Sequence, residues 1–461
     1  MKAKSLTFLG LVALLLSCQS PKEKLTPEQV ENLVADAYVH CFPIVENYKA
    51  VYFYGVLEAS PFFTPMNTVK HETRLYTADD KAVVRANNDT YYSTGVLDLR
   101  AEPVIFKVPE SGGRYYVFQL ASMTTDNFGY IGTRQTGSKA GIYAVTSPNF
   151  AGNLPDGVVQ IKAPSEFVGV AGRTAVSAED SSDMEAAQAL QSQFEIGVMS
   201  KFYPDFKPKT VEKIDFPAYS QASITTPEFF SLLNFLLPYT TLAPDDEAMI
   251  KKFEVIGINN SGSFTFLKEH PEYEEAFAAG VKKGLERIDA MMTEIGTVTN
   301  GWMLWPIQDP YFGSNFRLRT QIARGHIYAN CPIEAYYPAA RRDADGNPFN
   351  GQNSYTLTFP ADALPPAKFF WSLTMYDNIT GLMAHNELNR YSIGDRTKGL
   401  TYNKDGSLTI YMSHKMPKEG PSNWLPAPDG PFDILLRLYG PKDEVMNNTW
   451  IPQPVVKLVG N

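Results

Sequence analysis

The chain has 461 residues, of which 44% are hydrophobic, 20% charged and 13% aromatic. This composition is that of a globular protein, and it excludes collagen-like, disordered and multi-span membrane proteins. The 41 basic and 50 acidic residues give a formal charge of −9 without a basic run, so we expect no nucleic-acid partner. Three cysteines are too few for a disulfide framework or a four-cysteine zinc site.

Residues 1–17 have the pattern of an export signal. Lys2 and Lys4 form a positive start, and an apolar stretch over 8–16 is too short to span a bilayer comfortably. The letters LLS directly before Cys18 have the spacing of a lipobox, which predicts acylation of this cysteine, for example by palmitate, and attachment to a membrane. An ordinary cleaved signal followed by a chance cysteine is the alternative.

The residues after Cys18 indicate which membrane would hold it. Gln19 stands where aspartate would retain a lipoprotein at the inner membrane, so we expect an outer-membrane anchor that faces the periplasm. Residues 18–24 are polar and would form a tether. No later stretch is long and apolar enough to cross a bilayer, so the lipid on Cys18 would be the membrane contact.

Residues 25–178 are predicted to form an N-terminal helix followed by a β-rich domain. Thr26 and Pro27 form a helix start, with Gln29 at the capping-box position, and Pro43 is expected to end or kink the helix. Short β-rich runs separated by turn residues then predict an antiparallel sheet in a sandwich or open barrel. The predicted strands cover residues 102–108, 114–120, 141–146 and 158–163.

Residues 179–320 are mainly helical in pattern, and residues 321–461 return to a β pattern that predicts a C-terminal β-sandwich domain. The fold class is therefore α+β and mostly β, with two β-sandwich or barrel-like domains and a helical middle region. The main predicted helices cover 185–194, 227–237 and 273–292, and the C-terminal strands 355–359, 369–376, 407–413 and 432–439.

Several common sites lack support in the sequence. The six histidines are scattered singly without metal-ligand spacing, and the nucleophile elbow, the P-loop and the dinucleotide-binding glycine turn are missing. The sequence therefore predicts neither a metal nor a cofactor. Cys41 and Cys331 could pair in an oxidising compartment or remain as two buried thiols.

The densest polar cluster lies directly before a predicted strand, over residues 85–93. Its guanidinium, amides, carboxylate and phenols could bind a polar ligand or position an acid and a base. The same residue types also close turns on their own backbone and pin loops by ion pairs, so both interpretations stay open. The candidate residues are Arg85, Asn87, Asn88, Asp89 and Tyr92, with Asp89 as the candidate catalytic group.

Further candidates come from three other segments. Asp126 and Asn127 lie in a second polar loop, and Arg173 follows a glycine in a third. In the C-terminal part, Asn386 and Arg390 precede Trp424, whose ring near amide and guanidinium donors could form one wall of a ligand cleft. Trp371, within an apolar strand, is expected to be a core residue instead.

These segments resemble a two-part bacterial family known by domain-of-unknown-function labels. The strings VVRANNDTYYSTGVLDL, GRYYVFQL and TDNFGYIGTRQTGSKAG resemble its N-terminal half, labelled twelve-fifty-four. FFWSLTMYDNITGLMAHNELNRYSIGDRT and NWLPAPDGPFDILLRLYGPK resemble its C-terminal half, labelled twelve-fourteen. The resemblance covers most of residues 30–200 and 330–455. It implies two β-rich domains with helical insertions, is compatible with homo-oligomers and assigns no reaction.

One departure from the family pattern concerns the polar cluster. The family often has arginine-proline before the two asparagines, whereas Ala86 follows Arg85 here, so we expect a looser turn.

Two functional hypotheses follow for a membrane-anchored lipoprotein of the cell envelope. In the first, a cleft between the β domains binds a polar small molecule or glycan without changing it. In the second, the protein is a hydrolase-like enzyme in which Asp89 is the general acid or base and Arg85 binds an anionic group. The lack of a recognisable nucleophile favours binding.

Overall fold

The computed structural model describes residues 24–307, 312 and 315–458. The export signal, Cys18 and all but the last residue of the tether lie outside the described residues. Within the described part of the chain, no helix has both the length and the apolar character needed to cross a membrane.

The first helix, α1 (Pro27–Val51), begins as the sequence predicts. The Thr26 hydroxyl accepts a hydrogen bond from the Gln29 amide, and the Gln29 side chain accepts one from the Thr26 amide, which completes a capping box. The expectation that Pro43 ends the helix is wrong, since α1 continues to Val51 and is followed by a π-helical turn, η1 (Tyr52–Val56). Tertiary packing explains this, because nearly every residue from Ala37 to Tyr48 is buried.

The N-terminal β unit is a sandwich of two sheets. One has the order β1-β2-β8-β4-β5 and the other β7-β6-β3-β9. Its core lies between the sheets, where Phe106 of β3 and Phe118 of β4 place their rings 5.5 Å apart. The strands are β1 Lys70–His71, β2 Thr90–Asp98, β3 Val104–Val108, β4 Tyr116–Ala121, β5 Asn127–Gly132, β6 Gly141–Thr146, β7 Val158–Lys162, β8 Phe167–Ala175 and β9 Glu195–Val198.

All four predicted strands of this unit are present, but the expectation of a purely antiparallel arrangement is wrong. Strands β6 and β7 pair in parallel, because the chain between them returns to the same end of the sheet before β7 begins. Helix α2 (Ser181–Gln191) contacts β8, and its N-cap Asp180 accepts hydrogen bonds from two backbone amides.

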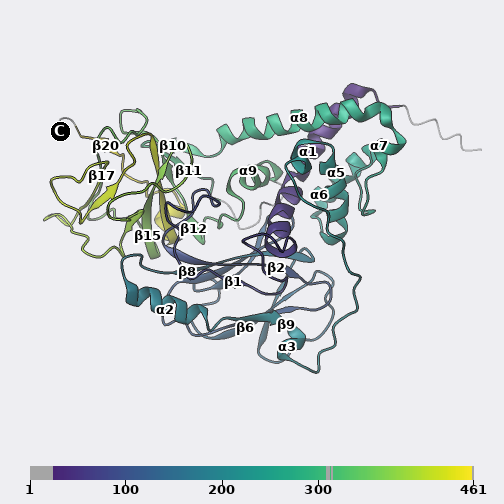
Figure 1. Ribbon diagram of the computed structural model, residues 1–461, viewed down its shortest axis with the longest axis horizontal. Coiled ribbons are helices and arrows are strands. Elements are labelled where there is room, and N and C mark those ends of the chain that lie inside the picture. The colour runs from purple at the N-terminus through teal and green to yellow at the C-terminus, as the bar shows by residue number, and fades with distance from the viewer. Residues whose placement is uncertain (1–23, 308–311, 313–314, 459–461) are drawn as a thin grey trace, which may run out of the picture.

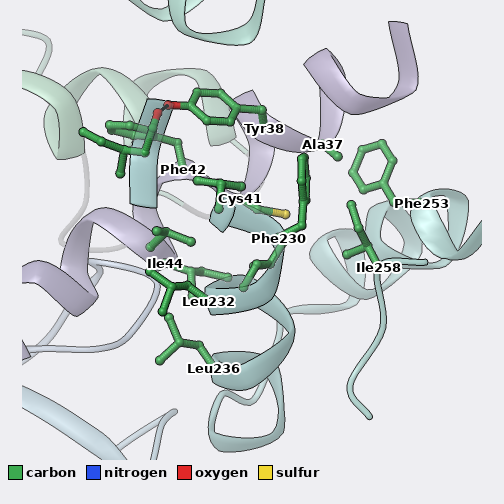
Figure 2. Packing of buried hydrophobic residues seen from close by; sticks show 14 of the residues in the cluster. Ala37, Tyr38, Cys41, Phe42, Ile44, Phe230, Leu232, Leu236, Phe253 and Ile258 are labelled. Carbon is green, nitrogen blue, oxygen red and sulfur yellow. Dashed lines mark hydrogen bonds between the residues drawn. The ribbon is translucent and has the colours of Figure 1, made fainter. Parts of the chain in front are cut away.

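The helical region packs around α1. Figure 2 shows Tyr38, Cys41 and Phe42 of α1 among apolar side chains of the later helices, including Phe230 and Phe253. The later helices are α3 Met199–Phe202, α4 Ala222–Thr225, α5 Glu228–Leu236, α6 Pro244–Phe253, α7 Phe266–Glu269, α8 Glu274–Met291 and α9 Phe316–His326, with short 3₁₀ turns η2 Leu237–Tyr239, η3 Glu254–Ile256, η4 Pro271–Tyr273 and η5 Met292–Glu294.

The C-terminal β unit is a second sandwich. A larger sheet runs β10-β11-β13-β19-β15-β16, with β12 also paired to β19, and faces a smaller sheet of order β18-β17-β14-β20. The strands are β10 Thr297–Thr299, β11 Trp302–Leu304, β12 Ala335–Tyr336, β13 Ala339–Ala340, β14 Tyr355–Phe359, β15 Ala367–Asp377, β16 Ser392–Gly394, β17 Leu408–Ser413, β18 Trp424–Pro426, β19 Phe432–Pro441 and β20 Val456–Lys457, with α10 at Asp443–Met446.

This unit begins earlier in the chain than the sequence suggests. Strands β10 and β11 form a hairpin that joins the large sheet through β13, so residues 297–304 contribute to it as well as residues 321–461. Each strand of this hairpin has only three residues, too short to show a β pattern against the helical sequence around it.

The predicted architecture of two β-rich units with a helical middle region is confirmed. In Figure 1 the N-terminal β unit lies below, and the C-terminal β unit and the helical region lie above it on opposite sides, with α9 between them. The two β units meet directly, and polar residues of both lie at that contact. Cys41 and Cys331 are both buried and free.

Candidate functional site

A pocket of about 270 Å³ lies where the two β units meet. The N-terminal unit contributes Asn88 and Asp89, at the start of β2, and the segment after β8. The C-terminal unit contributes strand β15, the edge strand β16 and the loops beside them. The full lining is Asn88, Asp89, Val176, Ser177, Ala178, Glu179, Trp371, Ser372, Leu388, Asn389, Arg390, Ser392, Gly394, Arg396 and Thr397.

Asp89 joins the two β units at this pocket. Its side chain is 4% exposed, and its carboxylate accepts hydrogen bonds from the hydroxyls of Ser372, at 2.6 Å, and Ser392, at 3.2 Å. Both serines belong to the C-terminal unit. Ser372 lies on β15 and Ser392 on β16, and the antiparallel pairing of these strands places the two serines near each other. A carboxylate held by two neutral donors keeps further lone pairs for a ligand.

Arg396 lines the pocket beside Asp89. Its Nη2 donates to the backbone oxygen of Asp89 at 3.2 Å, and its guanidinium lies 3.6 Å from the ring centre of Phe370. Burial lowers the pKa of Arg396 below its ordinary value, although nearby carboxylates such as Asp89 act in the opposite direction.

Arg390 and Glu179 form part of the pocket wall and engage each other. The Nε of Arg390 donates to Glu179 Oε1 at 2.7 Å, which links the segment after β8 to the C-terminal unit. Arg390 also donates to the backbone oxygens of Pro421 and Trp424. Most of its donors are thus used in holding the loops of the C-terminal unit.

The polar cluster of residues 85–93 divides between the pocket and its support. Asn87 does not line the pocket, because its side-chain oxygen accepts hydrogen bonds from the amides of Asp89 and Thr90 and its nitrogen donates to the Tyr92 hydroxyl at 2.7 Å. Asn88 does line it, while donating to the backbone oxygen of Tyr76. Asn87 and Tyr92 therefore shape the turn that presents Asn88 and Asp89.

Arg85 binds a different carboxylate from the one expected. Both of its terminal nitrogens donate to Asp433 of β19, with Nη2 to Oδ2 at 2.6 Å, and Asp433 is 1% exposed. The hypothesis that Arg85 acts beside Asp89 is wrong for this arrangement, because its guanidinium is already paired across the contact between the two β units. Arg85 is a structural connection near the pocket.

The candidates from the second and third polar segments also lie away from the pocket. Asp126 accepts a hydrogen bond from the amide of Phe312 at 2.9 Å, and Asn127 donates to the backbone oxygen of Ala329 at 3.1 Å. Arg173 donates to Gln119, Asn330 and the backbone oxygens of Ala171 and Tyr328, and it is 8% exposed. These residues hold the chain around α9 against the N-terminal sheet.

Two of the three C-terminal candidates have structural roles. Asn386 closes its own loop by bonds to the main chain of Ala384, Leu388 and Arg390. Trp424 is 1% exposed and donates to the backbone oxygen of Ser413 at 3.0 Å, so its expected place in a cleft wall is wrong. The short strand β18 draws this ring into the fold. Trp371 is a core residue, as expected, and it also borders the pocket.

Sequence reasoning missed several residues of the pocket. Ser372 could have been found, because a serine within the apolar strand β15 needs a buried hydrogen-bond partner. Arg396 lies in a quoted segment but resembled an ordinary loop arginine. Ser177, Glu179 and Ser392 gave no local signal. The pairing of β2 with β8 brings Ser177 and Glu179 near Asp89, and the contact between the two β units brings Ser392.

The arrangement can bind hydroxyl and anionic groups. Asp89 and Glu179 offer acceptors, and Arg396 offers donors. Among the residues that the structure describes, no group of three or more histidine, cysteine or acidic side chains is arranged to hold a metal ion.

Two family models match the chain, each on one side of this pocket. The model described as "Protein of unknown function (DUF1254)" matches residues 66–197, and the one described as "Protein of unknown function (DUF1214)" matches residues 334–443. The first range contains Asp89 and Glu179, and the second contains Ser372 and Arg396.

Two solved structures are similar to this chain to different degrees. The VPA0106 protein from Vibrio parahaemolyticus is 27% identical, with a TM-score of 0.74 over 93% of this chain and 100% of the other. A putative uncharacterised protein from Burkholderia cenocepacia is 11% identical, with a TM-score of 0.41 over 94% of each chain. No curated protein shows significant similarity to this chain.

Proposed function

Because the chain belongs to the DUF1254 family in its N-terminal half and to the DUF1214 family in its C-terminal half, we propose that its function resides where the two meet. The proposed function is the binding of a small polar molecule or glycan unit in the pocket beside Asp89. The hydrogen bonds from Ser372 and Ser392 to Asp89 carry this proposal, since they assemble one polar site from both halves.

The size of the pocket supports a small ligand. A volume of about 270 Å³ is just below the usual range for ligand sites, which begins at roughly 300 Å³. A single sugar ring or a compound of similar size fits such a volume, and a longer glycan would have to enter by one terminal unit.

A screen of metabolites and monosaccharides against the purified protein tests this proposal. We expect at least one compound to raise the melting temperature, and we expect Asp89→Asn to weaken its binding at least tenfold by removing a charged acceptor. Asp362→Asn, at an exposed aspartate outside the pocket, is the matched control. Unchanged affinity in a folded Asp89→Asn protein would remove Asp89 from the site.

The second candidate is a hydrolase-like activity. It is favoured by the presence of two carboxylates, Asp89 and Glu179, on the same pocket, because a pair of carboxyl groups can act as acid and base. Assays with chromogenic glycosides and esters test it. Turnover that falls at least 100-fold in Asp89→Asn, with KM little changed, would support the enzyme; binding without turnover in the wild type would support the first candidate.

We further propose that the protein works at the cell envelope, as an outer-membrane lipoprotein anchored through Cys18. The signal-like start of the sequence supports this proposal. Replacing Cys18 by alanine should move the protein from the membrane fraction to the soluble fraction, whereas Cys41→Ala, at a buried cysteine, should not. An unchanged distribution of Cys18→Ala would contradict lipid anchoring.

A further inference from the structure

Among the described residues, three buried or half-buried arginines lack the carboxylate partner that most arginines of this protein have. Most arginines, buried or exposed, have a carboxylate oxygen within 4.0 Å. These pairs include Arg85 with Asp433, Arg134 with Glu334 and Arg319 with Asp246. Such pairing is expected, because an uncompensated buried charge is costly. Among the described residues, the buried or half-buried arginines without such a partner are Arg173, Arg396 and Arg437.

Two of the exceptions are held by neutral groups outside the pocket lining. Arg437 is 4% exposed and donates to the hydroxyls of Thr374 and Tyr376, both at 2.6 Å, and to the backbone oxygen of Arg85. Arg173 donates only to amide and backbone oxygens and lies over the ring of Tyr92 at 5.8 Å. Neutral groups therefore satisfy the hydrogen bonds of both guanidinium groups.

The third exception, Arg396, lines the pocket itself. Its single hydrogen bond through the side chain goes to a backbone oxygen, so its Nε and Nη1 groups have no hydrogen-bond acceptor among the described residues. Arg390, which also lines the pocket, is by contrast paired with Glu179. The free donors of Arg396 favour a negative group in the pocket.

We propose that the ligand of this pocket is a small hydroxy acid, such as a sugar acid, whose carboxylate pairs with Arg396 and whose hydroxyl groups bond to Asp89. This inference rests on the proposed binding function and names its ligand class. The acceptor carboxylate of Asp89 requires donor groups on the ligand, and the donors of Arg396 require an anionic group.

Isothermal titration with two matched pairs of sugars tests the ligand class. D-glucuronate is compared with D-glucose, and D-galacturonate with D-galactose, so that each pair differs in the carboxylate. We expect at least one uronate to bind tenfold or more tightly than its neutral counterpart. We expect Arg396→Gln to abolish that preference and Arg396→Lys, which keeps the charge but loses the planar fork, to retain part of it.

The control variant is Arg342→Gln, because Arg342 is an exposed arginine outside the pocket and without a carboxylate within 4.0 Å. Arg342→Gln removes the same formal charge as Arg396→Gln, and it should leave the preference for uronates over neutral sugars unchanged. Thermal melts show whether each variant is folded. Arg396→Gln should keep the wild-type melting temperature within a few degrees, since the charge it removes has no partner in the protein.

The outcomes separate this inference from the function on which it rests. Neutral sugars that bind as tightly as uronates, with affinity that depends on Asp89 but not on Arg396, would overturn the anionic ligand and keep the binding function. Absence of binding by all four sugars would also overturn the inference. The binding function itself would fail only if the wider metabolite screen gave no ligand or a ligand insensitive to Asp89→Asn.

Discussion

At the scale of single residues, polar side chains in one short motif have separate roles. Asn87 bonds to its own turn, Arg85 pairs with Asp433 in the other β unit, and Asp89 reaches the pocket. A residue type therefore limits the roles available to it, and the partner that the fold supplies selects among them. The protonation of His326 depends in the same way on the residues that the fold places around it.

His326 makes the stability of the protein sensitive to acid. Its ring lies 4.2 Å from that of Trp305, and burial, with the charges of Arg85 and Arg341, lowers its pKa from 6.5 to about 4. As the pH falls below 6.5 the unfolded chain binds a proton here and the folded chain does not, so stability is lost between about 6.5 and 4.

We expect His326→Gln to show a smaller loss of melting temperature than the wild type between pH 7 and pH 4.5. The control is His385→Gln, since the His385 side chain is 68% exposed and should leave the pH profile unchanged. Parallel profiles of His326→Gln and the wild type would contradict this assignment.

At the scale of elements, α9 is the connection between the helical region and both β units. Arg319 of α9 forms two hydrogen bonds with Asp246 of α6, at 2.6 and 2.9 Å, and His40 of α1 lies 2.8 Å from the same carboxylate. All three side chains are buried. The neighbouring Arg324 pairs with Asp289 of α8 at the surface instead.

These two ion pairs of α9 should differ in their contribution to stability. Asp246→Asn leaves Arg319 buried without a full partner, and we expect a loss of about 3 kcal/mol in the free energy of unfolding. Asp289→Asn breaks the exposed pair and should cost less than about 1 kcal/mol. Denaturation with urea measures both, and equal losses would show that burial does not set the difference.

At the scale of the whole molecule, the two β units are joined by many buried polar contacts. The Tyr115 hydroxyl donates to Glu334 at 2.7 Å, the Tyr376 hydroxyl donates to the backbone oxygen of Ala86 at 2.6 Å, and Ser372 donates to Asp89. Separation would leave these groups without partners. We therefore expect the units to unfold together.

Tryptophan fluorescence can test this coupling, because all five tryptophans lie between residues 302 and 450 and report on the C-terminal unit. Gly169→Ala, in β8 of the N-terminal unit, would place a Cβ 2.2 Å from the hydroxyl of Tyr328, which donates to Asn47 at 2.6 Å. We expect a loss of about 1–3 kcal/mol from this overpacking.

If the two units unfold together, the unfolding midpoint of Gly169→Ala should fall by the same amount whether it is followed by fluorescence or by circular dichroism. Gly430→Ala is the control, since no atom lies within 4 Å of its added Cβ. A fall seen by circular dichroism alone would mean that the N-terminal unit unfolds independently.

The sequence by itself determined several elements of this protein, because local patterns act over a few residues. The capping box of α1, the exact span of β14 and the long helix α8 follow from side-chain periodicity and turn residues. It also placed Asn88, Asp89 and Arg390 at a site between the β units, where all three line the pocket.

Only the tertiary structure decided how the site is completed. Ser372, Ser392 and Arg396 lie about 300 residues from Asp89, and only the packing of one sandwich against the other brings them to it. The same packing assigned Arg85 to Asp433, and the pairing of β18 with β17 buried Trp424, since the partner of a charged or aromatic side chain is set by tertiary contacts.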